Sequence, residues 1–245
     1  MNFIFPMAGL SSRFKEAGFT LPKYMLYLKD KSVFNRCLSG FSKYFRNSNF
    51  IFIAKDIFDT QKFIEEECKV LNIQNFEIII LNHHTNGQAE TVMQGIEKSK
   101  LLTLNQLVIF NIDTFRTNFC FPHYCEKYDG YIEVFIGNGN NWSYAATLSP
   151  ESTRVASTAE KKQISNYCST GLYYFKNAKL FEIGFNEFYT KNSFNYTEKY
   201  IAPLYNSLIT LGYEIHINKI DINLVQFCGI PDEFFHCLKM EVNQT

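Results

Sequence analysis

The sequence predicts an α/β fold, a three-layer α/β/α sandwich around a mixed, mostly parallel central sheet. As far as residue 112, short apolar runs alternate with segments of helical period, as in parallel sheets covered by helices. After residue 113, strand-like runs follow one another without helices between them, which is typical of antiparallel strands. No stretch rich in Gly, Ser or Pro interrupts the chain, so we expect a single domain over residues 1–245.

The first half of the chain supplies the parallel strands and the helices between them. Residues 32–45 carry apolar side chains at helical spacing, and Ser32 or Asp30 can cap this helix at its N-terminus. Further helices are expected at residues 56–70 and 88–99. Apolar runs bounded by polar residues predict the strands, at residues 3–5, 49–54, 76–81 and 106–112.

The second half supplies the antiparallel additions to the same sheet. Four strand-like runs lie at residues 130–136, 142–148, 154–160 and 169–175. The remaining elements are expected to be helices at 178–190 and 198–211, a strand at 213–217 and a last helix from Pro231.

Composition excludes several classes of protein. Lys and Arg number 24, as do Asp and Glu, and the net charge of zero gives no global attraction to nucleic acid or to an anionic membrane. The first apolar stretch stops at Pro6 and does not read as a signal peptide. The seven Cys lack CxxC spacing, so neither a disulfide framework nor a zinc ribbon is indicated. We therefore expect a cytoplasmic protein.

The loop after the first strand is the first candidate binding element. The strand at residues 3–5 stops at Pro6 and gives way to Gly and Ser residues, so backbone N–H groups can approach an anion. Arg13 and Lys23 follow and would supply the counter-charge. An ordinary turn between strand and helix is the alternative for such a loop.

This segment resembles the signature loop of the sugar-phosphate nucleotidyltransferases, through Ala8, Gly9, Ser12, Arg13, Pro22 and Lys23. The resemblance covers nearly the whole chain and implies a Rossmann-like domain whose loop wraps the triphosphate of an NTP. Arg13 and Lys23 would then be catalytic. The family usually carries Gly where Ser11 stands, and the Ser11 hydroxyl can bond a phosphate or narrow the loop. Nucleotide contacts are expected from Met7, Ala8, Gly9, Ser11 and Ser12.

Asp113 follows a continuous apolar strand, and strand ends in open α/β sheets border the ligand crevice. Mg²⁺ is commonly held by one or two carboxylates together with substrate phosphates, so we expect Asp113 to bind Mg²⁺. Asn111, two residues earlier, is expected to contact the nucleotide. The alternative is that Asp113 only caps the turn after the strand. Phe115 stands where a D-x-D motif would need its second Asp, which disfavours a glycosyltransferase.

The corner before the helix at residues 88–99 is polar. By the resemblance, Gln88 would hydrogen-bond the nucleobase through its amide, which offers a donor and an acceptor, while Gly87 would leave room for the ring. Helix capping by Thr85 or Asn86 is a simpler account, and the two are compatible.

Glu160 and Lys161 end a predicted strand shortly before Gly171. They resemble the family's Glu-Lys motif, in which the Glu binds hydroxyls of the acceptor and the Lys binds its phosphate. Gly171 would then line the acceptor pocket, and Lys161 would be catalytic. Charged residues at a strand end can also be an ordinary solvated edge.

The residues around Gly229 resemble the family's approach to its last helix. Many members place a second metal-binding Asp two residues before this Gly, where the chain has Phe227. Asp221, the nearest upstream carboxylate, could substitute as a metal ligand. Asp232 and Glu233 fit better as acids of the first helical turn, favoured by the helix dipole.

Together these features predict a Mg²⁺-dependent nucleotidyltransferase that joins an NTP to a phosphorylated small molecule and releases pyrophosphate. By the resemblance we expect CTP as the donor and a role in making precursors of surface or capsular polysaccharide. The chain can act as a homodimer, without nucleic acid or membrane as a partner. The alternatives are a glycosyltransferase of the GT-A type and a non-catalytic nucleotide-binding regulatory subunit.

Overall fold

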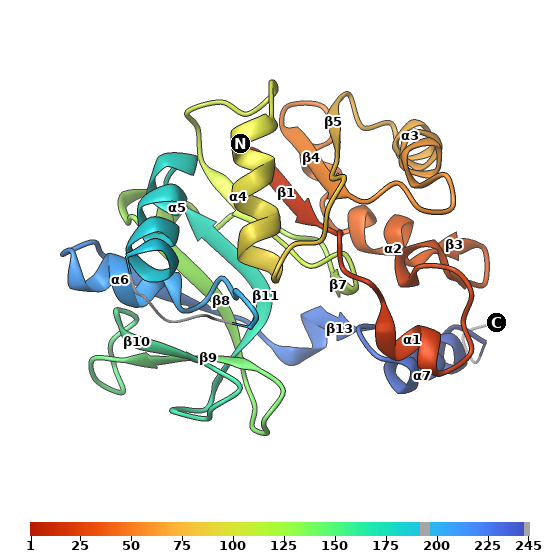
Figure 1. The fold of residues 1–245 in the computed structure, drawn as a ribbon. Helices are drawn as coiled ribbons and strands as arrows, with labels where there is room; N and C mark the ends of the chain where they lie inside the picture. The colour runs from red at the N-terminus through yellow and green to blue at the C-terminus, as the bar shows by residue number, and fades with distance from the viewer. Residues whose placement is uncertain (192–196, 243–245) are drawn as a thin grey trace.

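The computed structural model describes residues 1–191 and 197–242, which form one large sheet with helices on both faces (Figure 1). The strands pair in the order β12-β8-β11-β6-β1-β4-β5, and the β9–β10 hairpin joins the start of β11. The bounds are β1 Asn2–Pro6, β4 Asn49–Ala54, β5 Asn75–Ile80, β6 Leu107–Ile109, β8 Gly130–Ile136, β9 Ser143–Thr147, β10 Val155–Glu160, β11 Tyr167–Phe175 and β12 Ile215–Lys219.

The strand directions confirm the mixed, mostly parallel sheet. β1 is parallel to β4 and β6, β4 to β5, and β12 to β8. β11 is antiparallel to β6, β8 and β9, and β10 is antiparallel to β9. In the described part of this sheet, β10 and β11 therefore run against the direction that the other strands share.

Successive side chains along the central strands point to opposite faces of the sheet, so the sheet separates two hydrophobic cores. On β1, Phe3 and Phe5 belong to one core and Ile4 belongs to the other. The rings of Phe3 and Phe50, neighbours on β1 and β4, stack at 5.0 Å between centroids. The period of two in β-strands places these side chains on opposite faces, so each strand contributes to both cores.

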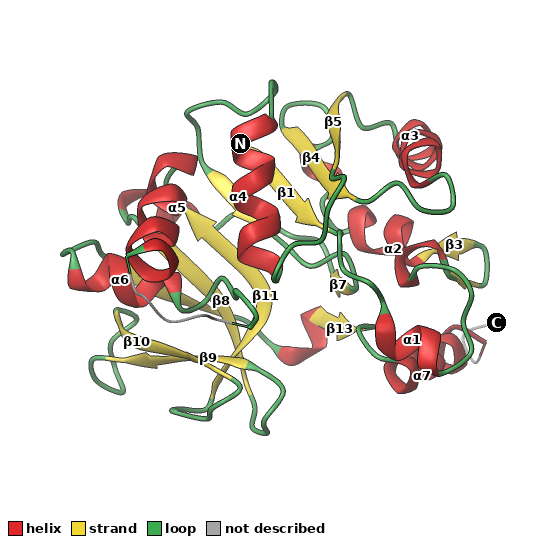
Figure 2. Ribbon diagram, in the orientation of Figure 1, coloured by secondary structure: helices red, strands yellow, loops and turns green. Residues whose placement is uncertain are grey.

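The helices cover these two cores (Figure 2). α2 (Val33–Ser39), α3 (Thr60–Leu71) and α7 (Pro231–Val242) pack on the Phe side, and α4 (Gln88–Lys98), α5 (Ala178–Phe185) and α6 (Leu204–Thr210) pack on the Ile side. The shorter helical turns are α1 Ser12–Glu16, η1 Lys23–Met25, η2 Ser42–Tyr44, η3 His123–Lys127, the π-helix η4 Asn186–Thr190 and η5 Ile222–Leu224.

Two predicted helices have only half their expected length in the structure. The helix predicted at 32–45 ends at Ser39, and the Gly40 carbonyl accepts the Phe119 N–H at 2.9 Å in place of a further helical bond. The chain packs so closely here that a Cβ on Gly40 would lie 1.9 Å from the Arg116 carbonyl oxygen. The helix predicted at 198–211 starts only at Leu204, after Pro203. Proline disfavours helical backbone in the residue before it. In the segment that precedes Pro203, Glu198 and Tyr200 line the cavities described below.

Two small two-stranded sheets complete the fold. β2 (Tyr27–Leu28) pairs with β3 (Lys31–Ser32). β7 (Thr114–Arg116) pairs with β13 (Val225–Phe227), which places Phe227 opposite Thr114. Segments more than a hundred residues apart in the sequence thereby meet directly after β6.

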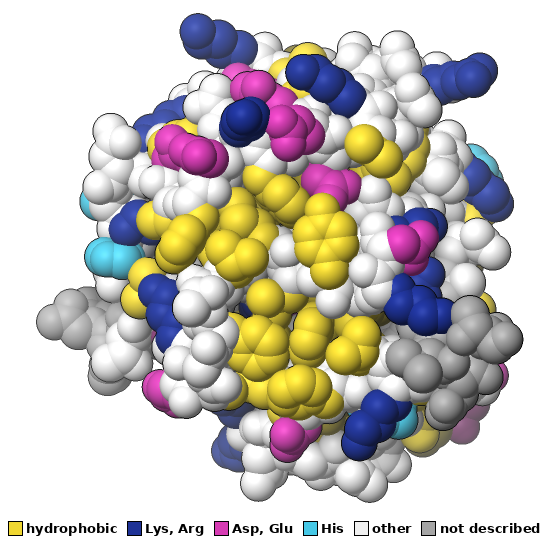
Figure 3. Space-filling view, turned by 90° about the vertical axis from the view of Figure 1, so that its right-hand side faces the viewer, with side chains coloured by type: hydrophobic (Ala, Val, Ile, Leu, Met, Phe, Trp, Pro, Cys, Tyr) yellow, Lys and Arg dark blue, Asp and Glu magenta, His cyan; other side chains and the backbone are white. Residues whose placement is uncertain are grey.

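The side of the molecule at the right of Figure 1 carries α1, α3 and α7, and hydrophobic side chains gather on it between charged ones (Figure 3). The segments on this side expose Leu21, Tyr27, Phe58 and Phe235. No helix in the described residues is both long and apolar enough to cross a membrane.

Candidate active site

Two adjoining cavities lie at the carboxyl ends of β1 and β6, the edge at which open α/β sheets bind ligands. The smaller has a volume of about 300 Å³ and the larger about 590 Å³. They are joined, because both are lined by Lys23, Gln88, Asn111, Asp113, Glu198 and Tyr200. The arrangement is one site with two compartments.

The loop after β1 lines the smaller compartment through Met7, Ala8, Gly9 and Ser11. Ser11 has a left-handed backbone, with φ 52°, the conformation that favours the glycine expected there. Its hydroxyl accepts a hydrogen bond from the Lys23 N–H at 3.3 Å, so this side chain ties the loop to Lys23. Ser12 starts α1 and lines neither compartment.

Asp113 and Lys23 form an ion pair where the two compartments meet. Their side chains are 14% and 26% exposed, so a ligand can reach both. The backbone carbonyl of Asp113 accepts the Cys228 N–H at 2.9 Å, next to the β7–β13 pairing. Asp113 is therefore fixed by the segment that carries Phe227.

Gln88, Asn111 and Gly171 are in contact at the boundary of the compartments. The Gln88 side-chain amide donates to the Asn111 side-chain carbonyl. Gly171 has φ 86°, and a Cβ on it would lie 2.4 Å from Asn111 Nδ2. Only glycine fits this position without moving Asn111, which links the nucleotide and acceptor residues predicted from the sequence.

Gly87 serves the fold in a way that the sequence did not suggest. A Cβ on Gly87 would lie 2.6 Å from the Lys199 backbone nitrogen, and the Ala89 N–H donates to the Lys199 carbonyl at 2.9 Å. The space on the Cβ side of Gly87 is thus filled by the chain. Gly87 also lines the smaller compartment, and its role of leaving room for a nucleobase stays a prediction. The N-cap of α4 is Gly87, which has no side chain, and the Thr85 hydroxyl is hydrogen-bonded to the Thr91 hydroxyl at 2.6 Å.

Glu160 and Lys161 lie at the larger compartment, at the end of β10. Burial raises the pKa of Glu160, whose carboxylate accepts a hydrogen bond from the Ser143 hydroxyl. Lys161 has a left-handed backbone, with φ 54°, and its ammonium donates to the Tyr200 hydroxyl and lies 3.7 Å from Glu198. A carboxylate and an ammonium are thus presented side by side, Lys161 in a conformation that costs of order 1 kcal/mol.

Aromatic rings form one wall of the larger compartment. The rings of Trp142 and Phe227 lie 4.6 Å apart, and that of Phe135 packs behind both at 5.2 and 5.5 Å. Where many family members would carry an Asp, this chain therefore has part of an apolar wall.

Glu233 is the carboxylate that lies near Asp113. Its Oε2 accepts the N–H groups of Gly229 and Ile230 at 2.8 and 3.3 Å. Burial raises the pKa of Glu233, and the negative charge of Asp113 raises it further. Arg13 lines the larger compartment together with Glu233. Glu233 thus binds the backbone at the start of α7, beside Asp113.

The residues around Asp113 fit a Mg²⁺ ion that takes most of its ligands from phosphates and water. Within the described residues, no group of three His, Cys, Asp or Glu side chains is placed to hold a metal. Asp221 lies outside both compartments, where its carboxylate accepts the Asn223 N–H at 2.8 Å at the start of η5. The expectation of a metal ligand at Asp221 is therefore not supported by its position.

Sequence reasoning missed Trp142, Ser143, Glu198 and Tyr200 as lining residues. Ser143 reaches the site because β9 pairs with β10 in a register that places it opposite Glu160, and such a register is not visible in the sequence. Pro203 could have indicated that the helix starts only after residue 202, since proline disfavours helical backbone in the residue before it.

No protein-family model matches the chain, and the comparison with curated proteins gives no match. Among solved structures, the nucleoside-diphosphate-sugar pyrophosphorylase from Vibrio cholerae RC9 is 43% identical. The match covers 97% of this chain and 99% of that one, with a TM-score of 0.94. The chain belongs to the sugar-phosphate nucleotidyltransferase family.

Two other members of this group of structures share the fold at low identity. The inositol-1-phosphate CTP transferase from T. maritima is 12% identical, with 97% and 94% of the two chains covered and a TM-score of 0.72. A UDP-glucose pyrophosphorylase solved with UDP-glucose is 13% identical, with 100% and 99% covered and a TM-score of 0.74. As a sugar-phosphate nucleotidyltransferase, the chain shares this architecture with both structures.

Proposed function

We propose that this protein is a Mg²⁺-dependent nucleotidyltransferase, which transfers NMP from an NTP to a phosphorylated small molecule such as a sugar phosphate and releases pyrophosphate. The observation that carries the proposal is the junction of the two compartments, where Lys23 and Asp113 lie between the signature loop and the Glu160–Lys161 pair. Membership of the family supports the same class of reaction.

The NTP would occupy the smaller compartment. The loop from Met7 to Ser12 would cover its phosphates with backbone N–H groups. Lys23 would contact the α-phosphate, and Arg13, on the side of the larger compartment, would hold the outer phosphates. Both cations would oppose the charge of the triphosphate.

The acceptor would occupy the larger compartment. Lys161 would bind its phosphate, while Glu160 would accept hydrogen bonds from hydroxyl or amino groups. Trp142 and Phe227 would pack against an apolar face of the molecule. Glu160 and Trp142 flank Ser143 on the β9–β10 hairpin, so one hairpin would present both kinds of contact.

The reaction needs little proton chemistry. An oxygen of the acceptor phosphate attacks the α-phosphorus in line, a new P–O bond forms, and the bond to the bridging oxygen breaks as pyrophosphate leaves with the electron pair. The attacking oxygen is already ionised at neutral pH, so no general base is required. Positioning and charge neutralisation by Lys23, Arg13 and Lys161 carry the catalysis. Mg²⁺, when bound at Asp113, would add to the neutralisation of phosphate charge.

We further propose CTP as the donor. The Gln88 side chain donates its NH₂ group to Asn111, which leaves its carbonyl to accept from an exocyclic amino group. Cytosine has such a group and uracil and thymine do not, whereas the purines adenine and guanine also have one. The product would serve as a precursor of surface or capsular polysaccharide, made in the cytoplasm by a homodimer. Light scattering in solution tests the homodimer.

A pyrophosphate-release screen tests the proposed function. CTP, UTP, dTTP, GTP and ATP are each combined with a panel of phosphorylated metabolites, and products are identified by mass. Trp142, which is the single Trp of the chain, lies in the larger compartment and reports acceptor binding by fluorescence. Nucleotide binding without turnover would favour a regulatory subunit, and sugar transfer from an NDP-sugar would favour a glycosyltransferase.

A further inference from the structure

We propose that the buried ion pair of Glu133 and Arg116 is a positioning device, which fixes the acceptor side of the site relative to the Asp113 loop. Glu133 lies on β8 with its side chain fully buried, and Arg116 lies on β7 with 7% exposure. Neither residue lines a compartment that we assign to a substrate. The kinetic arm of the test rests on the proposed function.

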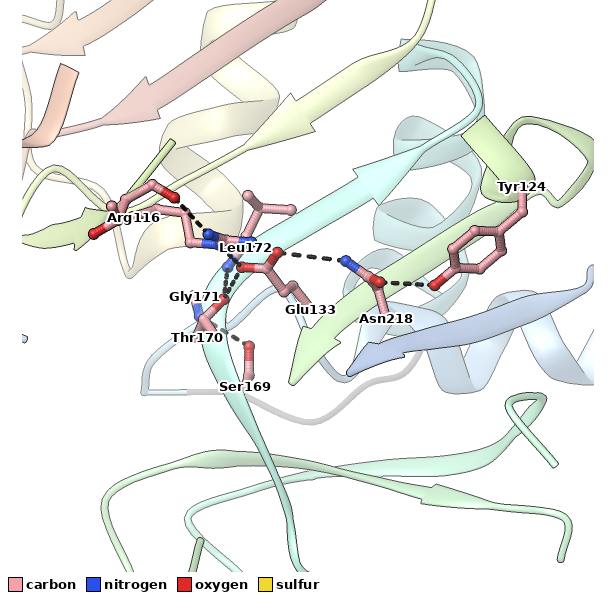
Figure 4. Close-up of polar contacts among 9 residues, drawn as sticks. Arg116, Tyr124, Glu133, Ser169, Thr170, Gly171, Leu172 and Asn218 are labelled. Atoms are coloured by element: carbon pink, nitrogen blue, oxygen red, sulfur yellow. Dashed lines mark hydrogen bonds and ion pairs between the residues drawn. The ribbon is translucent and has the colours of Figure 1, made fainter. Parts of the chain in front are cut away.

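Glu133 is the centre of a closed polar network (Figure 4). Its Oε1 accepts from Arg116 Nε at 3.0 Å and from the Thr170 hydroxyl at 3.1 Å. Its Oε2 accepts from Asn218 Nδ2 at 3.4 Å, and the Asn218 carbonyl accepts from the Tyr124 hydroxyl at 2.7 Å. The network therefore joins β7, β8, β11 and β12.

The stability of the fold does not require a fully buried ion pair. Removing two charges from water costs several kcal/mol per ion, and well-packed apolar residues of similar volume often stabilise a fold as much or more. Burial raises the pKa of Glu133, while Arg116 opposes this shift. A pair with this cost, placed between two segments of the site, points to a geometric role.

The network holds an irregular stretch of β11. The register of β11 against β8 shifts between Ser169 and Tyr173. Within this stretch the Ser169 hydroxyl accepts the Gly171 N–H at 3.0 Å, and the Thr170 hydroxyl accepts the Leu172 N–H at 3.3 Å. Since the Thr170 hydroxyl also donates to Glu133, the shape of this stretch is tied to the buried carboxylate.

The irregular stretch sets two contacts of the site. It brings Gly171 against Asn111, and it places the Tyr173 hydroxyl 3.2 Å from that of Ser143. Arg116, at the other end of the ion pair, belongs to the strand that starts directly after Asp113. One carboxylate thus fixes the distance between the acceptor strand and the Asp113 loop.

The test replaces the ion pair by apolar side chains in the double variant Glu133→Leu/Arg116→Met. We expect a moderately lower Tm, because the pair is exchanged for apolar volume while Thr170 and Asn218 lose their acceptor. We also expect a kcat reduced roughly 10- to 100-fold with a smaller change in KM for the NTP. Glu133→Gln should lower both Tm and kcat, because it leaves Arg116 buried without a charge partner. Glu67→Gln is the matched control.

Glu67 is also a buried carboxylate, bonded to Ser32 and Asn35 away from both compartments. Its amide variant should lower Tm while kcat stays at the wild-type value. Hydrogen exchange gives a readout independent of turnover: in the double variant, amides of residues 113–117 and 167–175 should exchange faster together, and in Glu67→Gln they should not.

A double variant that folds with wild-type kcat and unchanged exchange in both segments overturns the positioning role. If the wild type turns over no pair of NTP and acceptor, the proposed function fails, and the exchange measurement alone decides on Glu133. Faster exchange in both segments then supports the inference, and unchanged exchange contradicts it.

Discussion

Gly171 shows at the scale of one residue how the backbone shapes the site. Its φ of 86° strains any other residue, and a Cβ would meet Asn111 at 2.4 Å. Gly212 has a similar φ of 91°, but a Cβ there would have no heavy atom within 4 Å. The two glycines share the backbone requirement and differ only in what a side chain would touch.

We therefore expect Gly171→Ala to reduce kcat/KM by roughly 10-fold or more while Gly212→Ala leaves it unchanged. Both variants should lose about 1 kcal/mol of stability from the backbone conformation. Steady-state kinetics and urea unfolding separate the two effects. Equal kinetic losses in the two variants would assign the effect to general destabilisation and not to Asn111.

Glu160 gives a prediction about pH. Its carboxylate accepts hydrogen bonds from the acceptor more strongly when it is ionised, and burial raises its pKa above that of an ordinary glutamate. Acceptor kcat/KM should therefore fall as the pH falls through this raised pKa. For stability the sign is opposite: protonated Glu160 favours the folded state, and this contribution is lost as the pH rises through the folded-state pKa.

Glu160→Gln should remove this acidic limb from the profile of acceptor kcat/KM and lower the plateau by about 1–3 kcal/mol in transition-state free energy. NTP affinity, measured by calorimetry, should barely change. A weaker NTP affinity with an unchanged acceptor KM would place Glu160 outside the acceptor site.

At the scale of elements, the start of α2 depends on Ser32. Its hydroxyl accepts the Asn35 N–H at 3.0 Å and donates to Glu67 at 2.6 Å, in a fully buried position. Ser32→Ala removes the N-cap and one donor of a buried carboxylate, so it should cost about 2–3 kcal/mol. Urea unfolding measures this cost, and Ser42→Ala at an exposed position should stay within about 0.5 kcal/mol of wild type.

The elements also show which parts of the fold are predictable from the sequence. β4 was predicted with its observed bounds, and Ser32 was among the two expected caps of α2. Both depend on local patterns: an apolar run bounded by polar residues, and a hydroxyl directly before a helical segment. The end of α2 before Gly40 was not predictable in this way, since Gly40 contacts the backbone of Arg116 and Phe119, which lie far away in the sequence.

The site shows the same difference between residues in local motifs and residues placed by distant strands. The signature loop, Asp113 and Glu160–Lys161 are short motifs, and the structure brings them to adjoining compartments. Trp142 and Glu133 are placed by the pairing of strands that are distant in the sequence, so no local pattern identified them. Asp221 was chosen for its nearness in sequence to Phe227, and η5 turns it away from the site.

At the scale of the whole molecule, both cores share the strands of one sheet. If the strands unfold on one face of the sheet, the core on the other face is exposed as well. We therefore expect the chain to unfold as a single domain in one cooperative step. Trp142 reports the β9–β10 hairpin by fluorescence, and far-UV circular dichroism reports the whole chain. Coincident transitions in guanidinium are the expected result; an earlier fluorescence transition would show that the hairpin is a separate unit.

The central claim is that the joined compartments transfer a nucleotidyl group between two substrates across Asp113. The most direct measurement follows pyrophosphate and the mass of the nucleotide product together, with NTP and acceptor supplied separately and jointly. We expect both products in a ratio of about one to one, only when both substrates are present, and a loss of most turnover in a folded Asp113→Asn variant at saturating Mg²⁺. Wild-type kcat in Asp113→Asn, or pyrophosphate released without a joined product, would contradict the account.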